Sequence, residues 1–388
     1  MSVCVPTRLR WVLPVVAALL LVAACDGSTS GSGVADAASS AGRVTTNVAL
    51  PAGDEPVVVT PWGQDLLVGS RAPEGSASRP RLTVLDPAGG SHEVEVTPVS
   101  PTAFQAKWLV AAPRGATVDL VGGAPAGAHS NTRWSTWRGD TTAVRELPQP
   151  FATFGGWGAG ALVSLVQTPS APVIVGSWES GGAGLDIALW HPRGERWVRA
   201  SSAGTSLAST STALVSARGA TAAGEGLLVV GSVTLLGNGV RQRAAVWWSP
   251  KPDAKFSRTE LPDDGSLAEA HAASCNGTGR CAVVGVVDGR LRGWWVGAHG
   301  AVSEMDLPPL AVGEHDLLTA PLLGAGGATV LLASGGRLVV LDVAGDRVAR
   351  RDGPPARLVL STARTASGTF VVLEDPAGTA RLVRLDAP

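Results

Sequence analysis

Two cysteines are the residues best placed to react with one another. Cys275 and Cys281 bracket the segment Asn276-Gly277-Thr278-Gly279-Arg280, whose Asn and Gly residues are typical of a tight hairpin turn. In an exported protein, two cysteines on either side of such a turn oxidise to a disulfide. A redox pair is the alternative, but redox motifs place two residues between the cysteines, whereas this segment places five. The spacing therefore predicts a structural disulfide.

Other residue types that carry chemistry form no motif. The histidines lack the i, i+4 or His-x-His spacing of zinc ligands, so we expect no metal site. No nucleophile elbow, phosphate-binding loop or dinucleotide-binding glycine motif stands between a strand and a helix, so we expect no catalytic residue and no cofactor. The chain has 31 basic and 32 acidic residues and no basic stripe, which argues against nucleic acid as a partner. The six histidines are His92, His129, His191, His271, His299 and His315.

The amino-terminal segment carries the features of a secretion signal. Arg8 and Arg10 precede an apolar stretch of 14 residues, which is too short to span a bilayer as a helix. Small residues at positions 22 to 24 stand directly before Cys25, and in this respect the segment resembles a bacterial lipoprotein signal. The resemblance implies cleavage before Cys25 and transfer of a lipid, carrying fatty acids such as palmitate, to its thiol. An ordinary secretion signal is the alternative.

We therefore divide the chain into three parts. Residues 1–24 form the signal peptide. Residues 25–42 contain the lipidated Cys25 and a tether rich in Gly, Ser and Ala, whose composition is typical of flexible coil. Residues 43–388 remain for a globular domain. We expect the lipid to hold this domain at the cell membrane, facing out of the cytoplasm.

The globular part repeats a pattern of short strands. One strand of each copy ends in a tight turn such as Asp86-Pro87-Ala88-Gly89, where Pro and Gly occupy the positions that turns favour. An apolar strand precedes it, and seven copies in residues 43–388 give a period of about 49 residues. Units of about 40–50 residues with four short strands are typical of propeller blades. The sequence predicts an all-β fold, a seven-bladed β-propeller, with six or eight blades as alternatives.

The expected strands can be placed by residue number. The strands that end in turns are expected at 82–89, 133–139, 187–194, 245–251, 293–300, 337–345 and 380–388. The apolar strands before them are expected at 66–70, 117–122, 173–178, 227–233, 282–287, 329–334 and 369–374, and a further innermost strand fits in each gap. The tryptophans of the turn-ending strands are expected to pack between blades: Trp134, Trp137, Trp190, Trp247, Trp248, Trp294 and Trp295.

The two ends of the domain complement each other. The last copy ends at Pro388, directly after its third strand, whereas 43–51 (RVTTNVALP) is typical of a fourth strand with no blade of its own. Pairing this amino-terminal strand with the last blade closes the ring and covers an exposed strand edge. We expect this closure; the alternative is that 43–51 continues the tether.

Two of the turns resemble the Asp-box motif, which runs Ser-x-Asp-x-Gly-x-x-Trp. The segment 190–197 (WHPRGERW) keeps the Gly and the Trp but lacks the Ser and the Asp. The segment 249–256 keeps the Ser and has Phe256 in place of Trp. The domain therefore resembles the BNR (Asp-box) propellers and the related WD40/YVTN-like propellers. Some members of that group are sialidases with a Tyr nucleophile, and this chain contains no Tyr.

Two functions fit these features. The anchor, the tether and the lack of catalytic motifs favour a non-catalytic binding or scaffolding module, with another envelope protein or a glycan as its partner. The alternative, by analogy of fold, is an exported hydrolase or lyase that acts on a glycan. Propellers bind ligands at the mouth of the channel, so residues near the innermost strands are candidates for ligand binding, with core packing as the alternative for each. The candidates are Trp62, Lys107, Trp108, Trp157, Glu269, His271 and Arg364.

Overall fold

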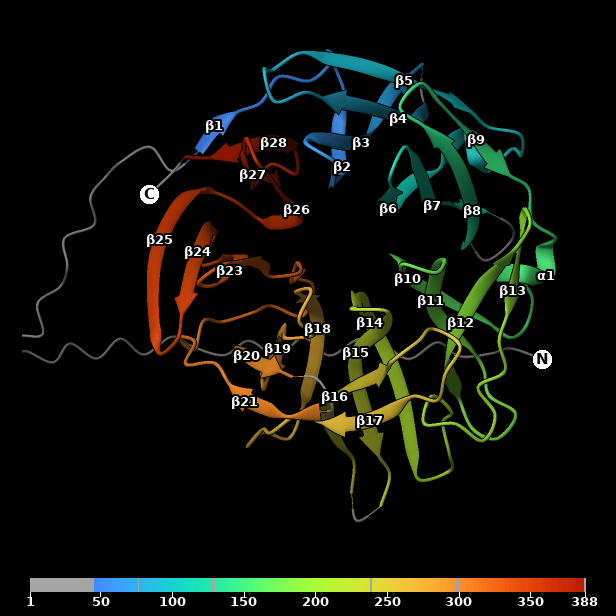
Figure 1. The fold of residues 1–388 in the computed structure, drawn as a ribbon, viewed down its shortest axis with the longest axis vertical. Coiled ribbons are helices and arrows are strands. Elements are labelled where there is room, and N and C mark those ends of the chain that lie inside the picture. Colours follow the sequence, from blue (N-terminus) through green and yellow to red (C-terminus); the bar gives the residue numbers. More distant parts are fainter. Residues whose placement is uncertain (1–44, 76, 127–129, 238, 298–299, 387–388) are drawn as a thin grey trace, which may run out of the picture. The chain divides into compact units, whose positions relative to one another are not determined.

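The computed structural model describes residues 45–75, 77–126, 130–237, 239–297 and 300–386. Within these residues, 28 strands, one 3-10 helix and one short α-helix are present, and the strands form six sheets. The sheets follow one another around a ring in chain order (Figure 1). The predicted all-β fold is therefore confirmed, and the ring is that of a β-propeller.

Five of the sheets have four strands, and the sixth has eight. The eight-stranded sheet divides where β5 and β9 pair in parallel, with Glu95 opposite Ala143. On each side of this pairing lie four antiparallel strands in the same order as in the other sheets. The described residues thus form seven four-stranded blades, the number that the sequence period predicts.

The blades follow the chain, and each begins with its innermost strand. Blade 1 is β2–β5 (Glu55–Trp62, Asp65–Glu74, Ala77–Leu85, Ser91–Thr97), blade 2 is β6–β9 (Lys107–Arg114, Thr117–Ala126, Asn131–Asp140, Ala143–Leu147), and blade 3 is β10–β13 (Ala159–Gln167, Pro172–Glu179, Leu185–Arg193, Arg196–Arg199). Blade 4 is β14–β17 (Ala213–Ala223, Gly226–Leu235, Arg241–Ser249, Ser257–Glu260), and blade 5 is β18–β21 (Ala268–Cys275, Cys281–Val287, Arg290–Val296, Val302–Glu304). Blade 6 is β22–β25 (Leu322–Gly324, Gly327–Ser334, Arg337–Ala344, Arg347–Pro355), and blade 7 combines β26–β28 (Leu358–Thr365, Gly368–Glu374, Ala380–Leu385) with β1 (Thr45–Asn47). The helices η1 (Ala103–Gln105) and α1 (Phe151–Phe154) lie between blades.

Strand β1 joins the two ends of the ring. Thr45 lies opposite Leu385 of β28, and the Thr46 hydroxyl donates a 2.8 Å hydrogen bond to the Asp386 carboxylate. The predicted closing strand is confirmed, but it is shorter than the expected segment 43–51. The Val48 N–H still donates a 3.0 Å hydrogen bond to the carbonyl of Leu382 in β28, and the chain then turns at Pro51, whose carbonyl accepts a hydrogen bond from the Asp54 N–H before blade 1 begins.

In five of the seven blades, the buried apolar run of the second strand ends in a glycine. In blade 4, Leu227–Val230 are fully buried, and Gly231 then lies opposite a bulge in β14. A Cβ atom on Gly231 would lie 1.9 Å from the carbonyl oxygen of Ser216, so the two backbones approach too closely for any side chain. A glycine faces the bulged first strand in four further blades: Gly69, Gly122, Gly176 and Gly285.

Buried tryptophans form hydrogen bonds to the connections between neighbouring blades. Trp247 of β16 is fully buried, and its indole N–H donates a 2.8 Å hydrogen bond to the carbonyl of Ser206, in the connection from blade 3. Trp190 and Trp294 are buried and donate to the connections that precede their own blades in the same way. Among the other tryptophans expected between blades, Trp137 and Trp295 are buried, and Trp134 and Trp248 are half-buried.

The connections define two faces of the ring. Because neighbouring strands of a blade are antiparallel, the turns between second and third strands lie at the same strand ends as the connections between blades. We call this side the loop face. The turns between first and second strands, and between third and fourth strands, lie at the opposite ends, which we call the turn face. Thr45, opposite the last residue of β28, lies toward the turn face.

The predicted disulfide is confirmed and lies on the turn face. Cys275 and Cys281 are bonded across the turn between β18 and β19, with their Cα atoms 3.9 Å apart. The side chain of Asn276 accepts hydrogen bonds from the backbone N–H groups of Thr278 and Arg280, so the turn is also held by its own polar groups. None of the helices in the described part of the chain is long and apolar enough to cross a membrane.

Candidate functional site

Two candidate residues, Trp62 and Trp108, lie in the core between blades 1 and 2. Trp62 is 6% exposed and donates a 2.7 Å hydrogen bond to the carbonyl of Gly115. Trp108 is 2% exposed, donates to the carbonyl of Arg81 over 3.0 Å and meets the ring of Trp137 edge-on at 5.3 Å. Side chains of a strand point alternately to the two faces of its sheet, and both indoles lie on faces that pack in the cluster shared by blades 1 and 2. The structure therefore places both in packing positions.

Three other candidates lie apart from one another. Lys107 is exposed at the start of β6, and Trp157 is fully exposed in the connection between blades 2 and 3. Arg364 of β26 donates hydrogen bonds to the hydroxyls of Thr329 and Thr369. It lines a hollow of about 390 Å³ that also contains Arg351, Arg384 and Asp386.

Glu269 and His271 are the candidates that the structure brings together. Both lie on β18, and His271 Nε2 is 3.4 Å from a Glu269 carboxylate oxygen. The same carboxylate is 2.7 Å from Nε of Arg218 and accepts hydrogen bonds from Ser232 Oγ (3.0 Å) and Gln242 Nε2 (3.3 Å). Arg218, Ser232 and Gln242 belong to three strands of blade 4, so Glu269 links blade 5 to blade 4.

The surroundings of Glu269 keep its carboxylate ionised. Burial raises the pKa of Glu269, but the hydrogen bond from His271, the positive charge of Arg218 and the hydrogen bond from Ser232 together outweigh burial and hold the pKa below its ordinary value. A carboxylate in this state is a weak base and has no proton to donate at neutral pH. The cluster is therefore suited to joining two blades and poorly suited to general acid–base catalysis.

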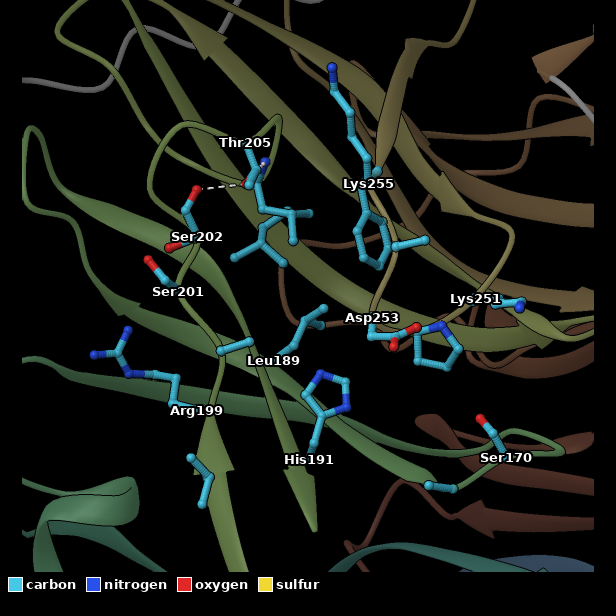
Figure 2. Close-up of a pocket in the computed structure, with 18 of the residues that line it drawn as sticks. Ser170, Leu189, His191, Arg199, Ser201, Ser202, Thr205, Lys251, Asp253 and Lys255 are labelled. Atoms are coloured by element: carbon cyan, nitrogen blue, oxygen red, sulfur yellow. Dashed lines mark hydrogen bonds between the residues drawn. The ribbon is translucent and has the colours of Figure 1, made fainter. Parts of the chain in front are cut away.

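A hollow of about 1090 Å³ lies between blades 3 and 4, away from the channel, and we call it the interblade groove. Its floor includes Leu189 and His191, alternate residues of β12 that point toward blade 4 (Figure 2). One wall is the connection that contains Ser202 and Thr205, and the other is the turn between β16 and β17. Both turns that resemble the Asp-box, 190–197 and 249–256, contribute to this groove.

The groove combines a neutral imidazole with charged rim residues. Burial lowers the pKa of His191, the nearby Asp253 carboxylate raises it, and Arg193 lowers it, with a net decrease. At neutral pH the imidazole is therefore uncharged and can donate or accept a hydrogen bond. Figure 2 shows Arg199 on one side of His191, with Lys251 and Asp253 on the other. In the described residues, no group of three or more His, Cys, Asp or Glu side chains could hold a metal ion.

Exposed apolar side chains gather on the loop face. Of the ten large apolar residues that are exposed in the described chain, nine lie in connections between blades or at turns between second and third strands. The tenth is Val198, which lies in the interblade groove. The nine are Val99, Phe104, Phe151, Trp157, Leu185, Leu236, Val240, Leu267 and Leu317.

Sequence reasoning did not identify the groove or the loop face. Lys251 and Lys255 lie four residues apart in a chain with three lysines, and this clustering is a signal that the sequence offered. Phe104 and Leu317 follow the end of one blade and precede the next first strand, where a solvent-exposed connection is normally polar. Cys25, the predicted lipidation site, lies outside the described residues.

Comparison with known proteins supports the fold alone. No protein-family model matches the chain, and no curated protein sequence is similar to it. The β-propeller domain of the Trilobed protease from Pyrococcus furiosus superimposes with a TM-score of 0.53 at 10% identity, over 86% of this chain and 96% of that one. Virginiamycin B lyase from Staphylococcus aureus superimposes with a TM-score of 0.53 at 9% identity, over 89% of this chain and 98% of that one. An ulvan lyase superimposes with a TM-score of 0.52 at 9% identity, over 88% of this chain and 94% of that one. At such low identity these similarities establish a β-propeller and carry no activity to this chain.

Proposed function

We propose that this protein is a membrane-anchored lipoprotein facing out of the cytoplasm, and that its propeller is a non-catalytic module that binds another envelope protein through the loop face. The observation that carries this proposal is the distribution of exposed apolar side chains, nine of which lie on the loop face. Exposed apolar side chains that share one side of a domain are a feature of surfaces that a partner covers. Trp157, Phe151 and Phe104 are the largest of these side chains, and aromatic residues often contribute most to a protein interface.

The proposed anchor is compatible with a free loop face. The lipid would be attached at Cys25, and the tether would reach the propeller at Thr45 on β1, which lies toward the turn face. A tether that arrives on that side does not need to cross the loop face. The proposed partners are therefore the membrane, through the lipid, and a second protein at the opposite face.

The geometry favours binding over the hydrolase or lyase alternative. A hydrolase of the two-carboxylate type needs one carboxyl group that gives up and regains a proton near neutral pH. Glu269, the acidic residue among the candidates, has its pKa lowered and is surrounded by four hydrogen-bonding side chains. Its negative charge forms an ion pair with Arg218 of blade 4.

The test compares the size of the detergent-solubilised protein with that of variants at each surface. Full-length protein taken from membranes of producing cells should migrate as a complex larger than the purified protein in the same detergent. The double variant Trp157→Ser/Val240→Ser should migrate like the purified protein, because it removes apolar contacts from the loop face. The control Val198→Ser changes the exposed apolar residue outside that face and should keep the larger complex. A complex unaffected by the loop-face variant, or glycan cleavage by purified protein, would contradict the proposal.

A further inference from the structure

The interblade groove is a second candidate binding surface, on the outer part of blades 3 and 4. We propose that it binds an organic anion with an apolar body, such as a carboxylic acid with an aliphatic or aromatic chain. This inference is independent of the proposed docking of a partner protein at the loop face.

The rim of the groove carries cations that have no acidic partner. Lys251, Lys255 and Arg193 line it, and in the described structure none of them forms an ion pair within 4.0 Å. Arg199 also lines the groove, but its guanidinium stacks on the ring of Trp178, 4.6 Å from the centroid, and is not counted with them. Three cations gathered around one concave surface create a positive potential that attracts an anion.

The acidic residues of the groove do not cancel this charge. Asp253 and Glu225 are the acidic side chains that line it, so the rim carries a net charge of +1 from Lys251, Lys255 and Arg193 when His191 is neutral. Residues 45–386 as a whole contain 28 basic and 30 acidic residues and are therefore net negative. The groove is thus positive within a slightly negative domain. Two of the three lysines in the chain lie in its rim.

The floor of the groove is apolar. Leu189, Leu207 and Phe256 form it together with Val198, which is 46% exposed. Figure 2 shows Leu189 in the middle of the hollow, between the charged side chains of the rim. A ligand that fills this space would bury apolar surface on the floor and place its acid group at the rim, a combination common in small-molecule sites.

Two of the four hydroxyl side chains that line the groove are already engaged within the protein, which favours an amphiphilic acid over an acidic glycan. Ser202 donates a 2.6 Å hydrogen bond to Asp186, and Thr205 donates one of 2.6 Å to the carbonyl of Ser202. Their protons are therefore already used within the protein. A glycan carries many hydroxyl groups that need free partners when they are desolvated, and an apolar floor does not supply them.

The first experiment uses two fluorescent probes with the same ring system and different charge. The anionic probe is 8-anilinonaphthalene-1-sulfonate, and the neutral one is N-phenyl-1-naphthylamine; both are titrated into purified protein. We expect the anionic probe to bind at least about tenfold more tightly, and added salt to weaken its binding because salt screens the rim charges. Equal affinity for the two probes, or no effect of salt, would overturn the proposal.

Variants then locate the probe. Lys251→Gln/Lys255→Gln should raise the dissociation constant of the anionic probe about tenfold, since the double variant removes two of the positive charges that attract it. Val198→Glu, which adds a carboxylate to the exposed part of the floor, should have a larger effect. The matched control Lys107→Gln changes the third lysine, which lies outside the groove, and should leave the constant unchanged. Equal effects of all three lysine substitutions, or no effect of the rim pair, would place the probe elsewhere and refute the site.

Displacement of the anionic probe by competitors distinguishes the classes of ligand, and a loop-face variant distinguishes this proposal from the docking of a partner protein. Decanoate should displace the anionic probe, whereas polygalacturonate, which has charge without an apolar body, should not. Displacement by polygalacturonate alone would identify a site for an acidic glycan and overturn the inference. Trp157→Ser/Val240→Ser should leave the lysine-dependent part of the signal unchanged, so loss of partner binding and loss of the groove ligand can be told apart.

Discussion

Replacing Gly231 with Ala tests how the blades are built. The added Cβ would lie 1.9 Å from the carbonyl oxygen of Ser216, whereas carbon and oxygen atoms in van der Waals contact are about 3.2 Å apart. The obstacle is backbone of the paired strand, so no side-chain rotation relieves it. The strands must separate by about 1 Å, which weakens the ladder beside the bulge between Ala217 and Gly219.

The expected loss of stability follows from this displacement. Overpacking a well-packed interior costs about 1–3 kcal/mol, and each weakened backbone hydrogen bond adds about 1 kcal/mol. We expect Gly231→Ala to lower the free energy of unfolding by about 3 kcal/mol. Urea unfolding followed by fluorescence of the buried tryptophans measures it, with Gly181→Ala as control, since nothing lies within 4 Å of a Cβ there. A Gly231→Ala protein as stable as the control would refute the proposed role of the glycine.

Three further substitutions probe other parts of the fold. Trp247→Phe removes the indole N–H that bonds the Ser206 carbonyl and should destabilise by about 1–3 kcal/mol in the same urea assay, whereas Trp157→Phe, at a fully exposed side chain, should have no effect. Glu269→Gln should lower the melting temperature at pH 7. Because the folded-state pKa of Glu269 is depressed, its contribution to stability is present above the ordinary pKa near 4.5 and is lost as the pH falls through the folded-state pKa. The melting temperatures of variant and wild type should therefore converge in acid, and a difference that stays constant with pH would contradict this. Replacing Cys275 and Cys281 together with Ser should destabilise by about 2 kcal/mol, as expected for a short closed loop, and an unchanged urea midpoint would show that the hydrogen bonds of the turn suffice.

Much of the fold could be predicted from the sequence because blades repeat local signals. Apolar runs, tight turns and the period located the second and third strands, and the unpaired strand near Thr45 predicted the closure that β28 completes. These features depend on neighbouring residues or on the whole repeat, so a single sequence contains them. The disulfide was predictable for the same reason, since Cys275 and Cys281 share one turn.

The candidate sites depend on contacts that the repeat does not encode. Trp62 and Trp108 were assigned to first strands correctly, but the sequence does not show which side of such a strand faces the channel, and both indoles lie between blades. The interblade groove brings His191 near Asp253, 62 positions further along the chain, and no local pattern relates them. The link from Glu269 to Arg218 likewise requires the docking of two blades.

If a partner covers the loop face, cysteines placed there should be less accessible to reagents in producing cells than in the purified protein. Single cysteines would be placed on the loop face by Trp157→Cys or Val240→Cys, and on the turn face by Ala88→Cys or Asp346→Cys, all at exposed positions. Their reaction with a bulky maleimide would be compared between intact cell envelopes and purified protein. We expect the loop-face cysteines to react at least about fivefold more slowly in envelopes than in purified protein, and the turn-face cysteines to react equally in the two preparations. Equal reactivity of all four positions in both preparations would contradict it.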